Sequence, residues 1–88
     1  MQAIDATSAQ LRAARSAVGW TVRELAKRSA VGEATIKRYE AAPSVPKSRK
    51  GNLQAIMLAY ESAGIEFIGT PNDAPGIRIH LAKPDAKK

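Results

Sequence analysis

The chain of 88 residues is long enough for one small domain with a single core, and too short for a second folded unit. Hydrophobic residues make up 44% of it and charged residues 25%, which excludes wholesale disorder, while the absence of cysteine excludes disulfides and thiolate chemistry. The net charge of +6 is concentrated in residues 11–51, which hold ten basic and three acidic side chains, so a polyanionic partner is expected.

A capping box opens the first predicted helix. Thr7 is followed three positions later by Gln10, a spacing that lets each side chain bond the backbone of the other residue, and a helix is expected over about 8–18. Gly19 suits the end of this helix. The expected apolar stripe consists of Leu11, Ala14 and Val18.

A second capping box, Thr21 with Glu24, predicts a helix over about 22–29. Trp20 and Leu25 strengthen this prediction, because they have the spacing of a hydrophobic staple, an apolar pair that brackets a helix start. The side chains expected to be buried are Leu25 and Ala26.

Two further helices are predicted beyond this point. One covers about 33–41 after Gly32, an acceptable N-cap residue. The other covers about 49–63 with Ser48 as its cap, after a proline-containing loop over 42–47. The outer face of the third helix is expected to carry Glu33, Ala34, Lys37 and Arg38, and the apolar face of the fourth Leu53, Ile56, Met57 and Tyr60.

The apolar period changes from about 3.6 residues to 2 after Gly64. Alternating apolar residues on either side of a turn-rich loop over 69–75 predict a β-hairpin. Residues 82–88 are expected to form a flexible tail. The positions that carry the alternation are Ile65 and Phe67 before the loop, and Ile77, Ile79 and Leu81 after it.

The predicted fold class is therefore mainly α. Residues 1–64 are expected to form a four-helix domain. The hairpin over 65–81 either closes the core of that domain or exposes an edge that pairs with a second subunit, and both alternatives stay open.

Residues 20–40 contain two short predicted helices joined by about three residues. This is the plan of a helix-turn-helix, whose second helix enters the major groove of DNA. An apolar seam is expected to lock the two helices together, which leaves the outer face of the second helix free to reach base edges. The seam consists of Leu25, Ala26, Val31 and Ile36.

Four stretches of the chain carry a resemblance to a known family. They read LRAAR at 11–15, TVRELA at 21–26, Val31, and TIKRYE at 35–40. Through them residues 8–63 resemble the lambda-repressor/Cro-like (Xre-type) regulators. The resemblance implies a four-helix lambda-repressor-like domain and a sequence-specific regulator of transcription that binds double-stranded DNA, with repression favoured.

The resemblance also implies roles for single residues. Base contacts are implied for Arg38, Glu33 and Ala34, and arginine can bridge the guanine O6 and N7 atoms. Glu33 either accepts a hydrogen bond from a cytosine amino group or only interacts favourably with the positive end of the helix dipole. A structural ion pair is implied between Arg15 and Glu40. The phosphate contacts implied are Thr21, Arg23, Thr35, Lys37, Lys47, Ser48, Arg49, Lys50 and Asn52.

Three positions depart from the family pattern. Val22 stands where a phosphate-binding glutamine is common, and Gly32 replaces a serine or threonine cap. Ala30 occupies a turn position where glycine is common, so a left-handed backbone there is expected to cost about 1–2 kcal/mol.

Other classes of function find little support in the residues. His80 is the only histidine and no acidic residue lies at ligand spacing from it, so neither a metal site, a cofactor nor catalysis is expected. No apolar run of about 20 residues predicts a membrane span, and a cytoplasmic protein is expected. Besides DNA, a homodimer through the hairpin or the fourth helix is expected. The alternatives are a toxin–antitoxin antitoxin and a protein-interaction module, such as an anti-activator, without DNA binding.

Overall fold

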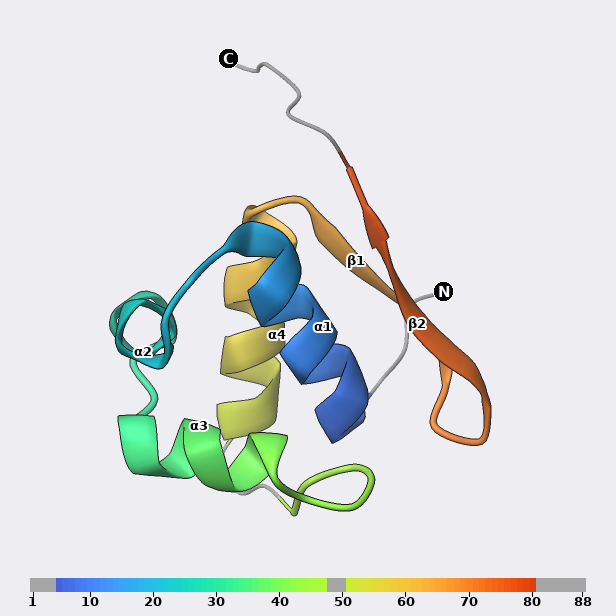
Figure 1. The fold of residues 1–88 in the computed structure, drawn as a ribbon, viewed down its shortest axis with the longest axis horizontal. Coiled ribbons are helices and arrows are strands. Elements are labelled where there is room, and N and C mark those ends of the chain that lie inside the picture. The colour runs from blue at the N-terminus through green and yellow to red at the C-terminus, as the bar shows by residue number, and fades with distance from the viewer. Residues whose placement is uncertain (1–4, 48–50, 81–88) are drawn as a thin grey trace.

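The computed structural model describes residues 5–47 and 51–80, which form four helices followed by a two-stranded antiparallel sheet (Figure 1). The predicted fold class, mainly helical with a C-terminal hairpin, is confirmed. No helix within these residues is both long enough and apolar enough to cross a membrane. The elements are α1 (Ser8–Val18), α2 (Val22–Ser29), α3 (Glu33–Glu40), α4 (Asn52–Ser62), β1 (Ile65–Thr70) and β2 (Asp73–Ile79).

Both predicted capping boxes are present. The Thr7 hydroxyl accepts from the backbone N–H of Gln10 at 3.1 Å, and the backbone N–H of Thr7 donates to Gln10 Oε1 at 2.8 Å. Thr21 and Glu24 exchange the equivalent bonds at 3.0 and 2.8 Å. Gly19 ends α1 in the left-handed conformation, with φ at 74°. The starts of α1 and α2 therefore follow from side chains only three residues apart.

Ala30 caps α2 in the left-handed conformation, with φ at 61° and ψ at 28°. An L-residue with a Cβ atom is strained there, whereas glycine is not. Ala30→Gly is therefore expected to raise the free energy of unfolding by about 1 kcal/mol, measured as a higher urea midpoint. Ala41→Gly is the control, because Ala41 caps α3 with φ at −93° and has no such strain to relieve. A midpoint for Ala30→Gly that is unchanged or lower would contradict this prediction.

The boundaries of α3 and α4 differ from the prediction. α3 ends at Glu40, one residue early, and α4 covers Asn52–Ser62 instead of 49–63. The N-cap of α4 is Gly51 and not Ser48, which lies outside the described residues. Gly51 has a left-handed backbone, with φ at 76°, and this conformation prevents the helix from extending toward the N-terminus.

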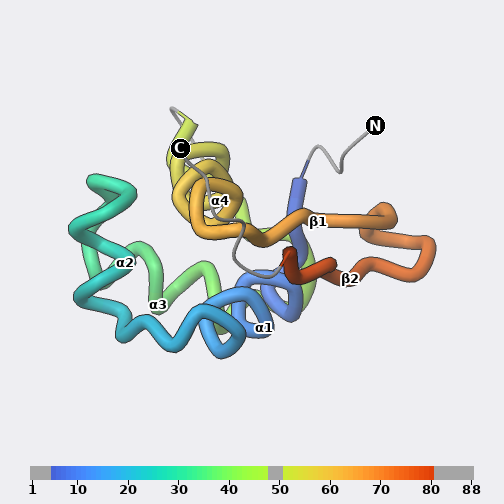
Figure 2. Tube along the Cα trace, turned by 90° about the horizontal axis from the view of Figure 1, so that it is seen from above, coloured from blue at the N-terminus to red at the C-terminus, as the bar shows by residue number. Residues whose placement is uncertain are grey.

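The core forms around α4, which contacts α1, α2 and β1. Figure 2 shows α2 on one side of the α1–α4 pair and the hairpin on the other. Ala26, which was predicted to be buried, is only partly so, since it borders a surface hollow between α2 and α3. The largest fully buried side chains are Tyr60, Phe67, Leu11, Leu25, Ile36, Leu53 and Ile56.

The hairpin turns more tightly than predicted. Its strands pair Ile65 with Ile79 and Phe67 with Ile77, and they continue to Thr70 and from Asp73, so the predicted loop over 69–75 is too long. A register shift between Ile68 and Thr70 makes the tighter turn possible, with Gly69 at a φ of 77°. β1 packs on α4 and β2 on α1. The positions Leu81 and 82–88 lie outside the described residues.

One buried glutamine joins α1 to the hairpin. The side-chain nitrogen of Gln10, Nε2, donates to the carbonyl oxygens of Ile68 at 3.0 Å and Gly76 at 2.8 Å. The side-chain oxygen accepts the capping bond from Thr7. Gln10 is only 3% exposed, and these three bonds satisfy all of its side-chain polar atoms. In the same turn, the Ser8 hydroxyl donates to Ala42 O at 2.6 Å. The first turn of α1 therefore holds both the hairpin and the segment after α3.

Three aromatic rings contact one another at the core. Trp20 lies parallel to Tyr60 at 5.6 Å between ring centroids, and Phe67 meets Tyr60 edge-on at 6.1 Å. The Arg28 guanidinium lies over the Trp20 ring, 4.5 Å from its centre. Trp20 and Tyr60 therefore contribute to the packing of the domain.

The Tyr60 hydroxyl is buried without a hydrogen-bond partner among the described residues. Burial, followed by the charge of Glu40, raises the pKa of this hydroxyl. Because an unsatisfied buried hydroxyl costs free energy, Tyr60→Phe is expected to leave the free energy of unfolding unchanged or raise it by up to about 1 kcal/mol. Urea unfolding measures this, with Tyr60→Leu as the control that removes the stacked ring. A loss above about 1 kcal/mol in Tyr60→Phe would show that the hydroxyl has a stabilising partner.

Candidate nucleic-acid interface

The helix α3 buries one face and exposes the other. Ile36 and Tyr39 point into the core, which fixes the rotation of the helix about its axis. The opposite face carries all three predicted base-contact residues together with a lysine, and all four are exposed. They are Glu33, Ala34, Lys37 and Arg38. The structure thus brings the predicted base-contact residues onto one continuous surface.

The turn between α2 and α3 is held by a serine that sequence reasoning missed. The Ser29 hydroxyl is buried, donates to Leu25 O at 2.8 Å and accepts from the Val31 amide at 3.2 Å. Val31, two residues after Ser29, is also buried. A serine in the last turn of a predicted helix, two residues before a valine expected to be buried, was the available signal. This turn sets the angle between the two helices of the motif.

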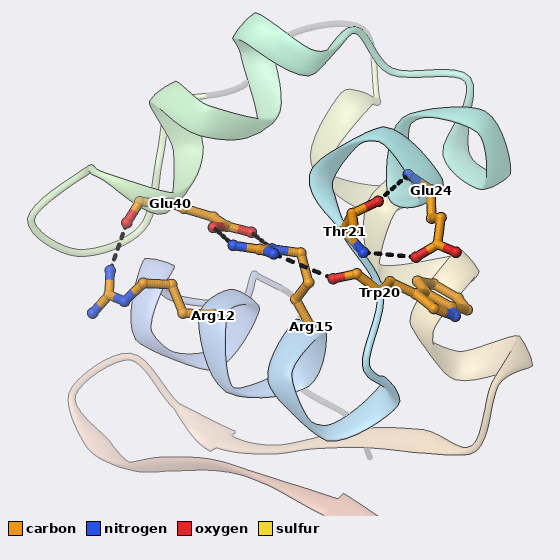
Figure 3. Close-up of polar contacts among 6 residues, drawn as sticks. All are labelled: Arg12, Arg15, Trp20, Thr21, Glu24 and Glu40. Atoms are coloured by element: carbon orange, nitrogen blue, oxygen red, sulfur yellow. Dashed lines mark hydrogen bonds and ion pairs between the residues drawn. The ribbon is translucent and has the colours of Figure 1, made fainter.

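The C-terminal end of α3 is tied to α1 by two arginines (Figure 3). Arg15 and Glu40 form the ion pair that the resemblance implied, with Nε–Oε2 at 2.7 Å and Nη2–Oε1 at 2.9 Å. Arg15 also donates to Trp20 O at 3.2 Å. Hydrogen bonding to Glu40 raises the pKa of Arg15. Arg12, which sequence reasoning did not single out, donates to the Glu40 carbonyl at 2.5 Å.

The predicted phosphate-contact residues fall into three groups. Thr21 and Arg23 open α2, Thr35 and Lys37 belong to α3, and Lys47 and Asn52 flank the segment that enters α4. Thr35 and Asn52 are half-buried, and the others are exposed. The first turn of α4 and the whole of α3 lie toward the same end of the molecule, the lower edge of Figure 1. Ser48, Arg49 and Lys50 lie outside the described residues.

The hairpin carries a separate charged cluster. Glu66 accepts from Arg78 at 3.1 Å and lies 2.8 Å from His80 Nε2, and these contacts, the one with His80 first, hold the pKa of Glu66 below its usual value. Glu66 and Arg78 belong to the two strands and His80 directly follows β2. Figure 2 shows the hairpin on the opposite side of the α1–α4 pair from α2. Among the residues that the structure describes, no group of three potential metal ligands comes together.

Comparison with known proteins adds one result to this geometry. A family model described as a helix-turn-helix domain matches residues 8–62. No curated protein matches the chain. The matched segment begins with α1, contains α2 and α3, and ends with α4, just before the hairpin.

Proposed function

Because this chain belongs to the helix-turn-helix domain family, we propose that it regulates transcription by placing α3 in the major groove of a specific double-stranded DNA site. The observation that carries the proposal is the exposed face of α3, on which long polar side chains stand opposite a buried anchor. The basic charge of residues 11–51 supports it, since phosphate neutralisation supplies much of the affinity for DNA. We assign the chain to the lambda-repressor/Cro-like (Xre-type) group on sequence resemblance, with repression as the favoured outcome.

The proposed base contacts use the chemistry of each exposed side chain. Arg38 bridges a guanine through two parallel hydrogen bonds, Ala34 touches a thymine methyl group, and Glu33 accepts from a cytosine amino group. The proposed phosphate contacts position the domain without reading sequence. They are Thr21, Thr35, Lys37, Lys47, Ser48, Arg49, Lys50 and Asn52.

The test is selection of bound DNA from a random pool at stated salt, followed by titration of the selected site. We expect log K to fall with log salt by about 0.9 per phosphate neutralised. Arg38→Ala is expected to relax the choice of base at one position by about 1–3 kcal/mol, while Lys47→Ala weakens all sequences alike. Binding that shows neither selection nor salt dependence would contradict the proposal and favour a protein-interaction module.

We further propose that the regulator is a two-fold homodimer, because one module reads few base pairs. Among the described residues, the large apolar side chains that remain exposed are Leu58 on α4, at 56%, and Ile79 on β2, at 54%. One lies on each of the two elements expected at the interface. Sedimentation measures the mass of the Leu58→Lys and Ile79→Lys variants. The substitution that makes the protein monomeric shows which of the two elements forms the interface. A wild-type mass that stays monomeric at micromolar concentration would contradict the dimer.

A further inference from the structure

We propose that Arg23 is a positioning residue for Glu33, and that the pair makes the DNA site prefer a cytosine–guanine base pair at one position. This inference rests on the proposed function. Arg23 is the second residue of α2 and Glu33 the first of α3, and the Arg23 Nε lies 3.9 Å from Glu33 Oε2. The contact crosses the turn of the helix-turn-helix. Both residues were expected to contact DNA separately, and the structure brings them together.

The Glu33 carboxylate remains available as an acceptor. The N-cap of α3 is Gly32, and no side chain caps this helix. Within the described residues the Glu33 carboxylate makes no hydrogen bond, and its contact with Arg23 leaves the side chain 47% exposed. A carboxylate with free lone pairs on the reading face can accept from the cytosine N4 amino group. This amino group is all that cytosine offers for hydrogen bonding in the major groove, whereas adenine presents its N6 amino group beside the N7 acceptor.

An acidic group at a DNA surface needs a nearby positive charge. The phosphates repel an isolated carboxylate, so its approach to a base edge is unfavourable unless a cation offsets its charge. Arg23 supplies that cation from α2, and the positive end of the α3 dipole adds to it. Lys27 lies in the same surface hollow, which is lined by Arg23, Ala26, Lys27, Ala30, Val31, Gly32 and Glu33. Unlike Arg23, Lys27 makes no ion pair with Glu33.

The two roles of Arg23 predict different binding data. An arginine that only contacts phosphate strengthens binding to every sequence equally. An arginine that orients and neutralises Glu33 strengthens binding only where Glu33 meets its base. The pair itself contributes little to stability because the Arg23 side chain is 79% exposed. Folding stability and base preference are therefore separable readouts.

The experiment measures the affinity of Arg23→Gln, Glu33→Gln and the double variant for the selected site and for each of its single base-pair replacements. Both single variants are expected to lose about five- to a hundred-fold of discrimination at the same C·G pair. The double variant is expected to lose no more than the larger single loss, because the two residues act as one unit. Lys27→Gln is the matched control and is expected to keep the preference. Urea midpoints are expected to stay the same in all four variants.

Two results would overturn this inference while DNA binding stands. One is an Arg23→Gln variant that weakens all sequences equally and keeps the C·G preference. The other is a Glu33→Gln variant that leaves the base preference unchanged. If the wild-type chain selects no site and binds without salt dependence, the proposed function and this inference fail together.

Discussion

Gln10→Glu is expected to destabilise the protein at neutral pH by about 3 kcal/mol or more, since it buries a charge that faces two carbonyl groups. In the native protein the Gln10 amide nitrogen donates to Ile68 O and Gly76 O, and its oxygen accepts from the Thr7 amide. A carboxylate keeps the bond from Thr7 but places a second oxygen against the two carbonyls. The side chain is only 3% exposed, so water cannot compensate.

The sign of the pH dependence distinguishes charge from packing. Burial and the facing carbonyls raise the pKa of the introduced carboxyl above its unfolded value of about 4.3. The loss relative to wild type is thus smallest below that pH and grows as the pH rises through it, because the unfolded chain ionises first. Gln10→Leu removes the same bonds without a charge, and its loss relative to wild type should not change with pH in this way. Urea unfolding from pH 3 to 7 measures both, and equal pH profiles would refute the argument.

The second large effect is expected from Arg15→Ala. The change strands the Glu40 carboxylate, whose side chain is only 10% exposed, and removes the bond to Trp20 O. Because the Arg15 side chain is itself 29% exposed, we expect a loss of about 2–3 kcal/mol, at the lower end for a broken buried pair. Thermal and urea unfolding measure it.

Two controls separate the stranded charge from general damage to α1. Arg15→Ala combined with Glu40→Ala should recover part of the loss, since no unpaired carboxylate remains. Arg12→Ala removes an exposed bond to the Glu40 carbonyl and is expected to cost less than about 1 kcal/mol. A loss below about 1 kcal/mol in Arg15→Ala would mean that water already screens the pair.

Features that depend on neighbouring residues were predictable from the sequence. The capping boxes at Thr7 and Thr21 join residues three positions apart, so their spacing alone predicted where α1 and α2 begin. The exposed face of α3 followed from its helical period. The start of α4 was predicted wrongly because Ser48 and Gly51 both suit an N-cap. The left-handed backbone of Gly51 has no signature in the neighbouring sequence that would have favoured it over Ser48.

Features that depend on distant contacts were not predictable. Gln10 has the right spacing for a cap, but its bonds to the hairpin span 58 and 66 residues. Arg12 reaches Glu40 across 28 residues, and Arg23 meets Glu33 only because the turn sets the angle between α2 and α3. The alternation of apolar residues in β2 includes Ile79, but such a pattern does not show which positions the helices cover. In the structure the Ile79 side chain remains exposed.

The stack of Trp20 on Tyr60 gives the protein a built-in optical reporter. Trp20 is the only tryptophan of the chain, so its fluorescence has a single source. In the native state the indole lies 5.6 Å from the Tyr60 ring, close enough for excitation of the tyrosine to pass to the tryptophan. The Arg28 guanidinium lies 4.5 Å from the same indole. Unfolding separates the start of α2 from α4 and ends this energy transfer. The emission of the unlabelled protein can therefore follow its own folding.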